Sequence, residues 1–304
     1  MYLKYYLEQL DYLKLPDFLI KYLKAPSLLR LKGIGYFCGM DYASKDIYNF
    51  REYISRYAHS LTVCLIVYRL TNDKNATLAG LFHDIATPCF SHVIDYMNQD
   101  YERQESTEEY TEHIIKSDKY LIECLKEDNI DINDIVNFKK YSVVDNDRPK
   151  VCADRIDGVI LTGIGWTKNI NRNDIKNIVQ DMCIFLNENN EYEIGFKSLE
   201  VAKKVLEVSD SIDKYCHSAE DNYMMELLAK ITKLSIERSY ITYHELYTYN
   251  ERNLFLLLKE KKDNKLQDLI NEFQSKKRSD IQELEMPKVK TRDLNPLVNG
   301  KRMK

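Results

Sequence analysis

The sequence has little of what interrupts helices, with only nine glycines and six prolines among 304 residues. Because these two residues disfavour helices most strongly, the chain is expected to form long helices joined by few tight turns. Its seven cysteines include no CxxC pair, which excludes a zinc ribbon and a thioredoxin-type redox motif. No apolar run approaches the roughly 20 residues of a transmembrane helix, and the regular charges in MYLKYYLEQLDYLK argue against a signal peptide. These absences predict a soluble protein of the reducing cytoplasm.

An excess of charge of one sign is also lacking. The 44 lysines and arginines nearly balance the 48 aspartates and glutamates, which gives a formal net charge of −4. A mildly acidic chain is not expected to coat nucleic acid, although a local basic channel is compatible with this balance. We therefore expect neither a membrane nor a nucleic-acid partner, and a small molecule instead.

Apolar residues recur at helical spacing through most of the chain. We expect helices over residues 49–70, 75–84, 88–97, 106–116, 149–161, 198–217 and 222–237, from Thr242 onward, and over 262–275. One segment departs from this pattern, because strand-like residues 179–186 and 191–196 flank a polar turn at 187–190 and predict a β-hairpin. The expected fold class is all-α, a helical bundle with one small β-hairpin and additional C-terminal helices.

The chain divides into four parts on this pattern. Residues 1–47 are expected to form an N-terminal helical segment, 48–165 a metal-binding core, and 166–258 the hairpin and helices that complete the same domain. Residues 259–304 are expected to form a charged C-terminal helix and a tail. We interpret the tail after Met286 as loosely ordered, because its apolar pattern is thin.

Four potential metal ligands lie on three of the predicted helices. His59 precedes the pair His83-Asp84 by 83 − 59 = 24 residues, and Asp154 follows that pair by 154 − 84 = 70, so only tertiary folding can bring them together. Imidazoles combined with carboxylates suit Mn²⁺, Fe²⁺, Zn²⁺, Ni²⁺ or Mg²⁺. A lone histidine is more often a boundary residue and a mid-helix aspartate is usually solvated. The apolar run 79–82 before His83 favours a site instead, since a buried aspartate needs a partner.

The order H…HD…D, as His59, His83-Asp84 and Asp154, resembles the HD-domain metal-dependent phosphohydrolase superfamily. Within it, RYAHSL is similar to the string RFxHSL of the deoxynucleoside triphosphate triphosphohydrolase branch, and GLFHDIATPCFSHVID to LLHDIGHGPFSHxFE. That branch includes bacterial dGTPases and the human sterile-alpha-motif HD enzyme. The string DKYCHSAEDNYMMELLAKI more weakly resembles its YxH segment. The resemblance covers roughly residues 27–240 and makes 48–165 the HD core.

The resemblance implies one divalent metal ion with four ligands, namely His59, His83, Asp84 and Asp154. It also implies substrate-binding roles. Arg56 stands one helical turn before His59 and matches a phosphate-contacting arginine, although a surface charge is the alternative interpretation. Arg155 takes the place of a phosphate-binding lysine. Tyr215 and His217 match the YxH pair and would contact base, sugar or phosphate, unless Tyr215 is simply a core residue.

Several positions depart from the family pattern. A catalytic histidine of the triphosphohydrolases is replaced by Thr87, which we interpret as the N-cap of a helix that begins at Pro88. The downstream His-Glu pair becomes Gln104-Glu105, and a tyrosine and an aspartate become Gly158 and Thr162. We predict that proton transfer falls to three residues instead: Glu105, with His92 or Asp95. The alternative role for His92 is a hydrogen bond that joins two helices.

The predicted function is a metal-dependent phosphohydrolase that acts on a nucleotide or related phosphate ester through a metal-activated water. Two alternatives stay open: a true dNTP triphosphohydrolase, which releases tripolyphosphate, and a non-catalytic HD module that binds a nucleotide or partner as a sensor. A purely structural helical protein ranks last. Because HD triphosphohydrolases commonly oligomerise, the resemblance also implies a homo-oligomer.

Overall fold

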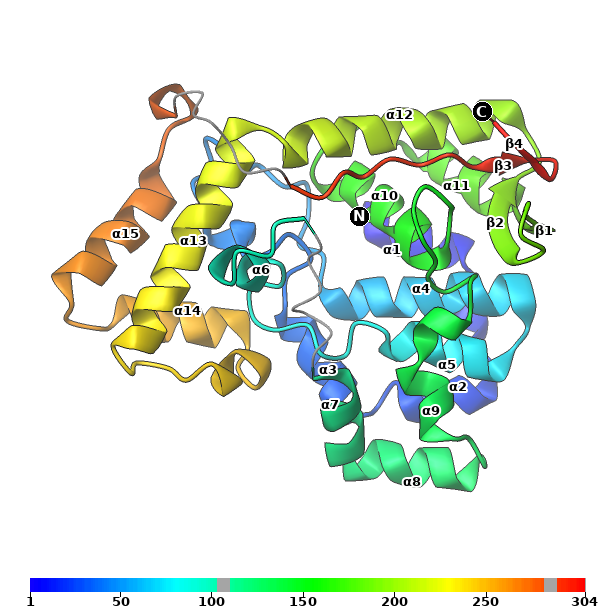
Figure 1. Ribbon diagram of the computed structural model, residues 1–304, viewed down its shortest axis with the longest axis horizontal. Coiled ribbons are helices and arrows are strands. Elements are labelled where there is room, and N and C mark those ends of the chain that lie inside the picture. The colour runs from blue at the N-terminus through cyan, green and yellow to red at the C-terminus, as the bar shows by residue number, and fades with distance from the viewer. Residues whose placement is uncertain (103–109, 282–288, 304) are drawn as a thin grey trace.

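The computed structural model describes residues 1–102, 110–281 and 289–303, and most of them are helical, as predicted (Figure 1). Helices α4 (Arg56–Thr71), α5 (Lys74–Phe82) and α10 (Ala153–Gly165) form the centre, with α5 and α10 both packed on α4. Helix α12 (Leu199–Cys216) packs in turn on α10. In the described residues, no helix combines the length and apolar character that a membrane span requires.

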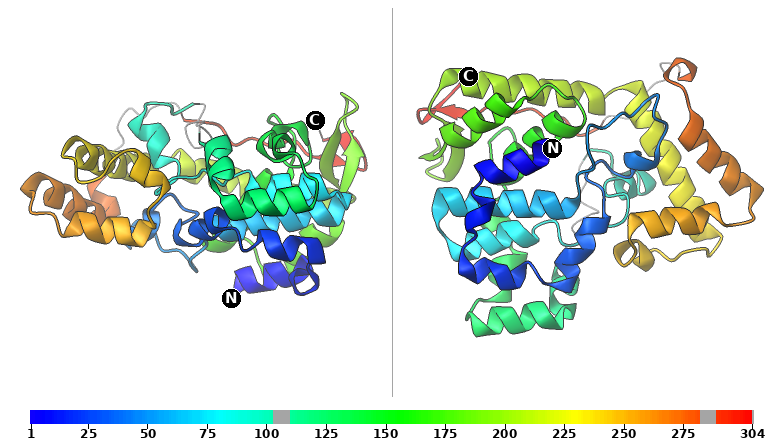
Figure 2. Two further views of the ribbon diagram at one scale, coloured as in Figure 1. Left: turned by 90° about the horizontal axis from the view of Figure 1, so that it is seen from below. Right: turned by 180° about the vertical axis from the view of Figure 1, so that it is seen from behind.

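The other helices surround this centre or extend it. They are α1 (Tyr2–Gln9), α2 (Asp17–Tyr22), α3 (Pro26–Arg30), α6 (Val93–Met97), α7 (Thr111–Ser117), α8 (Lys119–Glu127), α9 (Ile132–Val136), α11 (Arg172–Asp181), α13 (Ala219–Glu237), α14 (Glu251–Lys259) and α15 (Asn264–Ser275). Helices α13, α14 and α15 form a separate group with α6, on the left in Figure 1 and on the right in the view from behind in Figure 2.

The connection between α4 and α5 brings two of the predicted ligands together. The Ser55 hydroxyl accepts a hydrogen bond from the Ala58 backbone N–H (3.2 Å) and opens α4, which ends at Asn72 in the left-handed conformation (φ 53°). The Asp73 carboxylate then accepts from the Ala76 N–H (2.9 Å) and opens α5 immediately. Because only two residues separate the helices, they lie side by side, and His59 on α4 faces His83 at the end of α5.

Helix α10 carries the third part of the candidate site. It is almost entirely buried between α4 and α12, with Asp154 in its first turn. Close approach to α12 requires a residue without a side chain at Gly163, where an added Cβ would lie 2.9 Å from a Val208 methyl carbon. The packing of α10 against α12 thus fixes the position of Asp154 relative to the two histidines.

The predicted β-hairpin is present, as part of a larger sheet. Strands β1 (Met182–Leu186) and β2 (Tyr192–Phe196) pair antiparallel, with Met182 opposite Phe196. Two short strands from the C-terminal segment, β3 (Leu297–Val298) and β4 (Lys301–Arg302), extend this sheet, and β3 runs parallel to β2. Asn299 and Gly300 form the tight turn between β3 and β4. Both have positive φ, which is typical of a two-residue hairpin turn.

The prediction of a loosely ordered tail is therefore wrong for residues 289–303. Val289 and Leu297 are buried, and the Asn299 N–H donates to the Phe196 carbonyl (2.9 Å). Arg302 forms an ion pair with the fully buried Glu193 (2.6 Å). The small number of apolar residues wrongly suggested a loosely ordered tail, because this segment is held mainly by backbone hydrogen bonds and one buried charge pair.

Some helix boundaries also differ from the prediction. Helix α4 begins at Arg56 rather than at residue 49, α10 begins at Ala153 rather than at 149, and the segment from Thr242 forms a 3₁₀ turn before α14. The expected helix 88–97 is reduced to α6, because Phe90 and Ser91 have positive φ (66° and 48°). The interpretation of Thr87 as an N-cap is wrong, since no helix begins at Pro88 and the buried Thr87 hydroxyl has no hydrogen-bond partner among the described residues.

Candidate functional site

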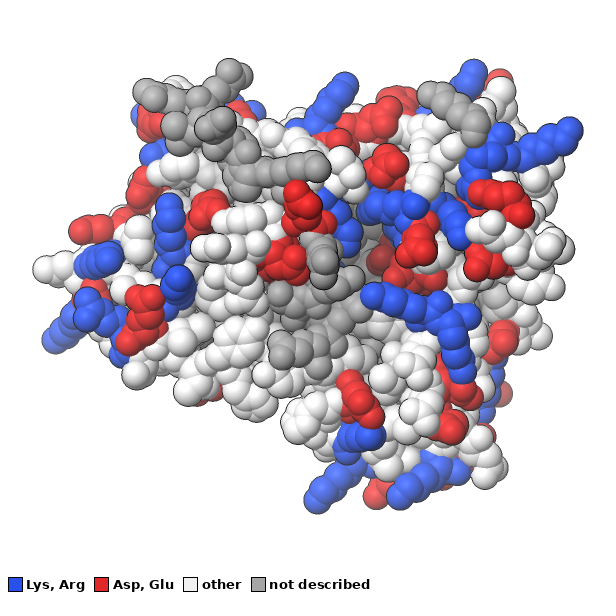
Figure 3. Space-filling model, in the orientation of Figure 1, with Lys and Arg blue, Asp and Glu red and all other residues white. Residues whose placement is uncertain are grey.

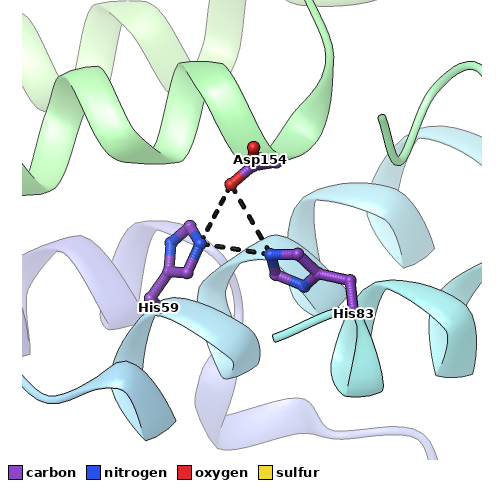
Figure 4. Close-up of side chains that lie close together, drawn as sticks. All are labelled: His59, His83 and Asp154. Carbon is purple, nitrogen blue, oxygen red and sulfur yellow. Dashed lines mark hydrogen bonds and ion pairs between the residues drawn. The ribbon is translucent and has the colours of Figure 1, made fainter. Parts of the chain in front are cut away.

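Three of the four predicted ligands meet at one point between α4, α5 and α10 (Figure 4). The Asp154 Oδ1 atom lies 3.0 Å from His59 Nε2 and 3.5 Å from His83 Nε2, and the two Nε2 atoms are 3.2 Å apart. Ligand atoms bound at about 2.1 Å to one metal ion lie roughly 3.0–3.4 Å from one another in octahedral or tetrahedral geometry. The spacing therefore fits a single small divalent cation.

The hydrogen bonds of the two imidazoles leave lone pairs directed into this point. His83 Nδ1 lies 2.8 Å from the Gly80 carbonyl oxygen, which can only accept, so this nitrogen carries a proton. His59 Nδ1 lies 2.7 Å from Asp157 Oδ2 and donates to that carboxylate. In the neutral rings both Nε2 atoms are then acceptors, facing each other and a carboxylate oxygen. Three acceptors in contact repel one another unless a cation or a proton lies between them.

The electrostatics support the same conclusion. Burial alone would lower the pKa of His59, but the hydrogen bonds and charges of Asp154 and Asp157 outweigh it and raise this pKa to about 10. The pKa of His83 is also raised, by Asp84 and Asp154 against the opposing effect of burial. Positive charge, on a bound cation or on protonated imidazoles, therefore stabilises this group of side chains. A divalent cation and protons compete for the same atoms, as at other histidine–carboxylate metal sites.

The fourth predicted ligand, Asp84, lies beside this cluster and not within it. Its carboxylate oxygens are 3.7 Å from His59 Nε2 and 3.9 Å from His83 Nε2. Arg56 Nη1 donates to Asp84 Oδ2 (2.8 Å), and Arg56 Nε donates to the Ser91 hydroxyl (3.2 Å). Although burial raises the pKa of Asp84, Arg56 and the two histidines hold it below its ordinary value. Asp84 is therefore an ionised carboxylate at the edge of the cluster.

Two neighbours of the cluster were missed by sequence reasoning. Asp157 is fully buried on α10 and also accepts a hydrogen bond from the Tyr6 hydroxyl (2.7 Å). Its position three residues after Asp154, on the same helix face, was the available signal. Tyr36 lies between the Arg56 guanidinium (4.9 Å from its ring) and the His59 ring (5.0 Å). Its hydroxyl is 3.0 Å from where a Cβ on Gly158 would be, so Gly158 leaves the space that Tyr36 uses.

Replacing Asp157 with asparagine is expected to weaken metal binding by about 10–100-fold, the usual effect of losing the carboxylate that orients a ligating imidazole. An amide no longer fixes the proton of His59 on Nδ1. Tyr6→Phe is the matched control, because it removes the other hydrogen bond of Asp157 and keeps the His59 contact. Metal titration by isothermal calorimetry measures both, and equal affinities in the two variants would rule out this orienting role.

A cavity of about 200 Å³ opens beside the cluster. Because one water needs roughly 15 Å³, the cavity has room for a ligand well beyond a few waters. Its lining includes Asp154 and Arg56 together with the aromatic residues Phe37, Phe50 and Trp166. Phe37 and Phe50 are stacked with ring centroids 4.3 Å apart. Figure 3, in the orientation of Figure 1, shows basic and acidic side chains gathered around a hollow near the centre of the molecule.

The residues predicted to handle protons are placed differently from one another. His92 lines the cavity, and its Nδ1 is hydrogen-bonded to Oδ2 of the buried Asp95 (2.8 Å). A carboxylate that fixes one ring nitrogen leaves the other available for the cavity. Glu105, like Gln104, lies outside the described residues. Arg155 also lines the cavity, where it is held by Asp145 (3.0 Å).

Tyr215 and His217 do not reach this cavity. Tyr215 lines a neighbouring hollow and contacts Trp166, with ring centroids 5.5 Å apart. His217 is among the described lining residues of neither hollow, and its Nδ1 donates to the Asp213 carbonyl (2.7 Å). Tyr48, Trp166 and Asp221 line both hollows. These three residues therefore separate Tyr215 from the cavity that Asp154 lines.

A buried glutamate positions two of the loops that border the cavity. Glu251, the first residue of α14, accepts hydrogen bonds from the Gly35 N–H (2.9 Å) and the Phe90 N–H (2.7 Å). These loops carry Tyr36 and the Ser91-His92 pair. Burial raises the pKa of Glu251 to about 8 although both N–H groups oppose the change. Helix α14 thus holds two of the loops that border the cavity in place, through Glu251.

Comparison with known proteins agrees with this geometry. Residues 56–159 match the family model described as HD domain. The uncharacterized protein YdhJ of Bacillus subtilis (strain 168) is 28% identical over 139 residues, which are 44% of this chain and 40% of that protein. The chain therefore matches well under two thirds of that relative's length, and the more specific assignment to the triphosphohydrolase branch stays a prediction. The matched segment contains each of the four predicted ligands, from α4 to α10, and it identifies residues 56–159 of this chain as an HD domain.

Proposed function

We propose that this protein is a metal-dependent hydrolase of a nucleotide or a related phosphate ester. The observation that carries the proposal is the meeting of three acceptor atoms, on His59, His83 and Asp154, at metal-ligand spacing, with Asp154 also lining a cavity. These three side chains would hold the ion, with Asp84 as a fourth ligand or a partner of its water. A bound divalent ion would supply Lewis acidity, which acidifies water and neutralises phosphate charge.

The residues around the cluster would divide the remaining work. Arg56, fixed by Asp84 and Ser91, would hold a non-bridging phosphate oxygen, and Arg155, fixed by Asp145, would hold another. Fixed guanidinium groups stabilise charge that develops during phosphoryl transfer. His92 would give a proton to the leaving oxygen, since Asp95 orients its ring toward that task. Glu105 is the other proposed proton-transfer group.

The residues that line the cavity support a nucleotide as the phosphate ester. Phe37, Phe50 and Trp166 form an aromatic wall in the same cavity as Arg56 and Asp154. Flat apolar side chains suit the face of a base, while the basic side chains suit its phosphates. Binding sites for small molecules commonly combine an apolar lining with a few such polar groups.

The test combines metal analysis with product analysis. Purified protein is assayed for bound Mn, Fe, Zn, Ni and Mg, and each metal is then added back in a screen of nucleoside mono-, di- and triphosphates. Orthophosphate release supports a phosphoesterase, and inorganic tripolyphosphate together with nucleoside supports the triphosphohydrolase alternative. Nucleotide binding without turnover under every metal would overturn the hydrolase and favour a sensor module, for which the loss of the family histidine at Thr87 is the present argument.

A further inference from the structure

Tyr36, which lines the cavity, has a hydroxyl group that forms no hydrogen bond with any residue that the structure describes. Two other tyrosines of the lining differ from it in this respect. The Tyr48 hydroxyl donates to Asp221 Oδ1 (2.6 Å). The Tyr96 hydroxyl donates to Asn222 Oδ1 (2.9 Å). The Tyr36 hydroxyl is therefore the one of these three that is available to a ligand in the cavity.

Backbone hydrogen bonds fix the position of Tyr36 relative to the start of α4. The Tyr36 N–H donates to the Ile54 carbonyl (2.9 Å). In the opposite direction, the Arg56 N–H donates to the Ile34 carbonyl (2.9 Å). These two bonds pair the segment that carries Tyr36 with the segment that leads into α4. Tyr36 and Arg56, the proposed phosphate-binding arginine, are therefore held side by side.

Contacts of the Tyr36 ring restrict the direction of its hydroxyl. The Arg56 guanidinium carbon lies 4.9 Å from the ring centroid, and the centroid of the His59 ring lies 5.0 Å from it. The Phe37 ring meets the Tyr36 ring edge-on at 5.6 Å. Arg56 is itself held by Asp84 (2.8 Å). A donor fixed in this way loses little conformational freedom when a ligand binds, which favours affinity.

Gly158 on α10 leaves the space that this hydroxyl occupies. A Cβ added there would lie 3.0 Å from the Tyr36 oxygen, the one described atom within 4 Å outside the local backbone. Glycine disfavours helices, so its use inside α10 is explained by this close approach. Position 158 follows Asp154 by one helical turn on the same face, and side chains lean toward the helix N-terminus. The hydroxyl therefore lies beside the turn of α10 that begins near Asp154.

We propose that Tyr36 is a substrate-binding residue, whose hydroxyl donates a hydrogen bond to a non-bridging oxygen of the phosphate group that Arg56 holds beside Asp154. A phenol is protonated at neutral pH and can donate to such an oxygen. The phosphate then has a neutral and a charged donor from two paired segments. This proposal rests on the proposed function for the identity of the ligand, but the binding of phosphate can be measured without turnover.

The experiment measures the Kd of inorganic orthophosphate by isothermal titration calorimetry on the full chain as purified. Tyr36→Phe removes only the hydroxyl and is expected to raise this Kd about tenfold, the usual effect of losing one hydrogen bond to a charged group. Tyr192→Phe, which removes the hydroxyl of an exposed tyrosine of β2, is the matched control and should leave the Kd unchanged. The metal content should be equal in both variants, because neither hydroxyl is a proposed metal ligand.

A substitution on α10 tests the same hydroxyl independently. Gly158→Ala should raise the Kd of orthophosphate about threefold, because the hydroxyl must shift away from the added methyl group and its hydrogen bond is weakened. In the Tyr36→Phe background, Gly158→Ala should have no further effect, since the oxygen that would meet the methyl group is gone. Because alanine favours helices over glycine, the melting temperature of Gly158→Ala should not fall, which excludes a folding defect as the cause of weaker binding.

The outcomes separate the role of Tyr36 from the hydrolase as a whole. Weaker orthophosphate binding in both single variants, with no further loss in the double variant, supports the proposal even if no ester is hydrolysed. Three results would overturn it: wild-type affinity in Tyr36→Phe, fully additive effects of the two substitutions, or a wild-type chain that binds no orthophosphate. Each of these leaves hydrolysis at the metal cluster open to its own test.

Discussion

Protein in which Asp154 is replaced with alanine is expected to be purified without stoichiometric metal and to hydrolyse phosphate esters at least about a thousandfold more slowly. Asp154 Oδ1 is the carboxylate oxygen that lies next to the Nε2 atoms of both imidazoles (3.0 and 3.5 Å), so the substitution removes a negatively charged ligand from the cluster. Lewis acidity contributes several kcal/mol to such reactions, and each 1.36 kcal/mol is a factor of ten in rate. Metal analysis and initial rates measure the two effects.

The control for this variant is Asp210→Ala, which removes an exposed aspartate of α12 far from the cluster in sequence. It should retain both metal and activity. Helical circular dichroism is expected to be unchanged in both variants, because Asp154 lies in the first turn of α10 and carries no N-cap hydrogen bond. Metal content and turnover at wild-type levels in the Asp154 variant would remove this residue from the proposed site.

The convergence of the predicted ligands was inferred from the order of the motif residues, and in the structure local rules account for part of it. Ser55 and Asp73 are N-cap residues that begin α4 and α5, and the two-residue connection between these helices makes them neighbours. His59 and His83 then face each other almost automatically. The motif order supplied the remaining information, namely that Asp154 from a distant helix joins them.

The supporting residues could not be predicted in the same way. Tyr36 comes from an irregular segment, and its place between Arg56 and His59 depends on Gly158 leaving space on α10. Lys290 and Arg292, which line the cavity, come from a segment with few apolar residues. No periodicity marks such contacts, because they are set by backbone hydrogen bonds and by the packing of elements far apart in the chain.

The fold shows a similar division between local and distant determinants. Helix α12 was predicted within one residue at each end, since its amphipathic pattern is regular over its whole length. The helix expected at 88–97 was too long, because the left-handed residues Phe90 and Ser91 are held by contacts from Glu251 and Arg56. Tertiary contacts there override a local propensity that favours helix.

Arg302→Ala is expected to lower the free energy of unfolding by about 3 kcal/mol, toward the lower end of the usual cost of breaking a buried ion pair. Glu193 is fully buried, and its two oxygens accept from Arg302 Nη1 (2.6 Å) and Nη2 (2.8 Å). Without the arginine, the donors that the carboxylate retains among the described residues are neutral, namely the Val151 N–H and the Asn187 amide. Because Arg302 is itself 16% exposed, water offsets part of the loss. Urea unfolding followed by circular dichroism measures the change.

Two further variants identify the buried charge as the cause of this loss. Glu188→Ala removes the other acidic partner of Arg302, whose side chain is 57% exposed, and should change stability little, as is usual for surface pairs. Adding Glu193→Gln to Arg302→Ala should recover part of the lost stability, since a neutral amide costs less to bury than an unpaired carboxylate. If Glu188→Ala proves as costly as Arg302→Ala, or if the second substitution recovers nothing, the buried pair does not anchor the C-terminal strands.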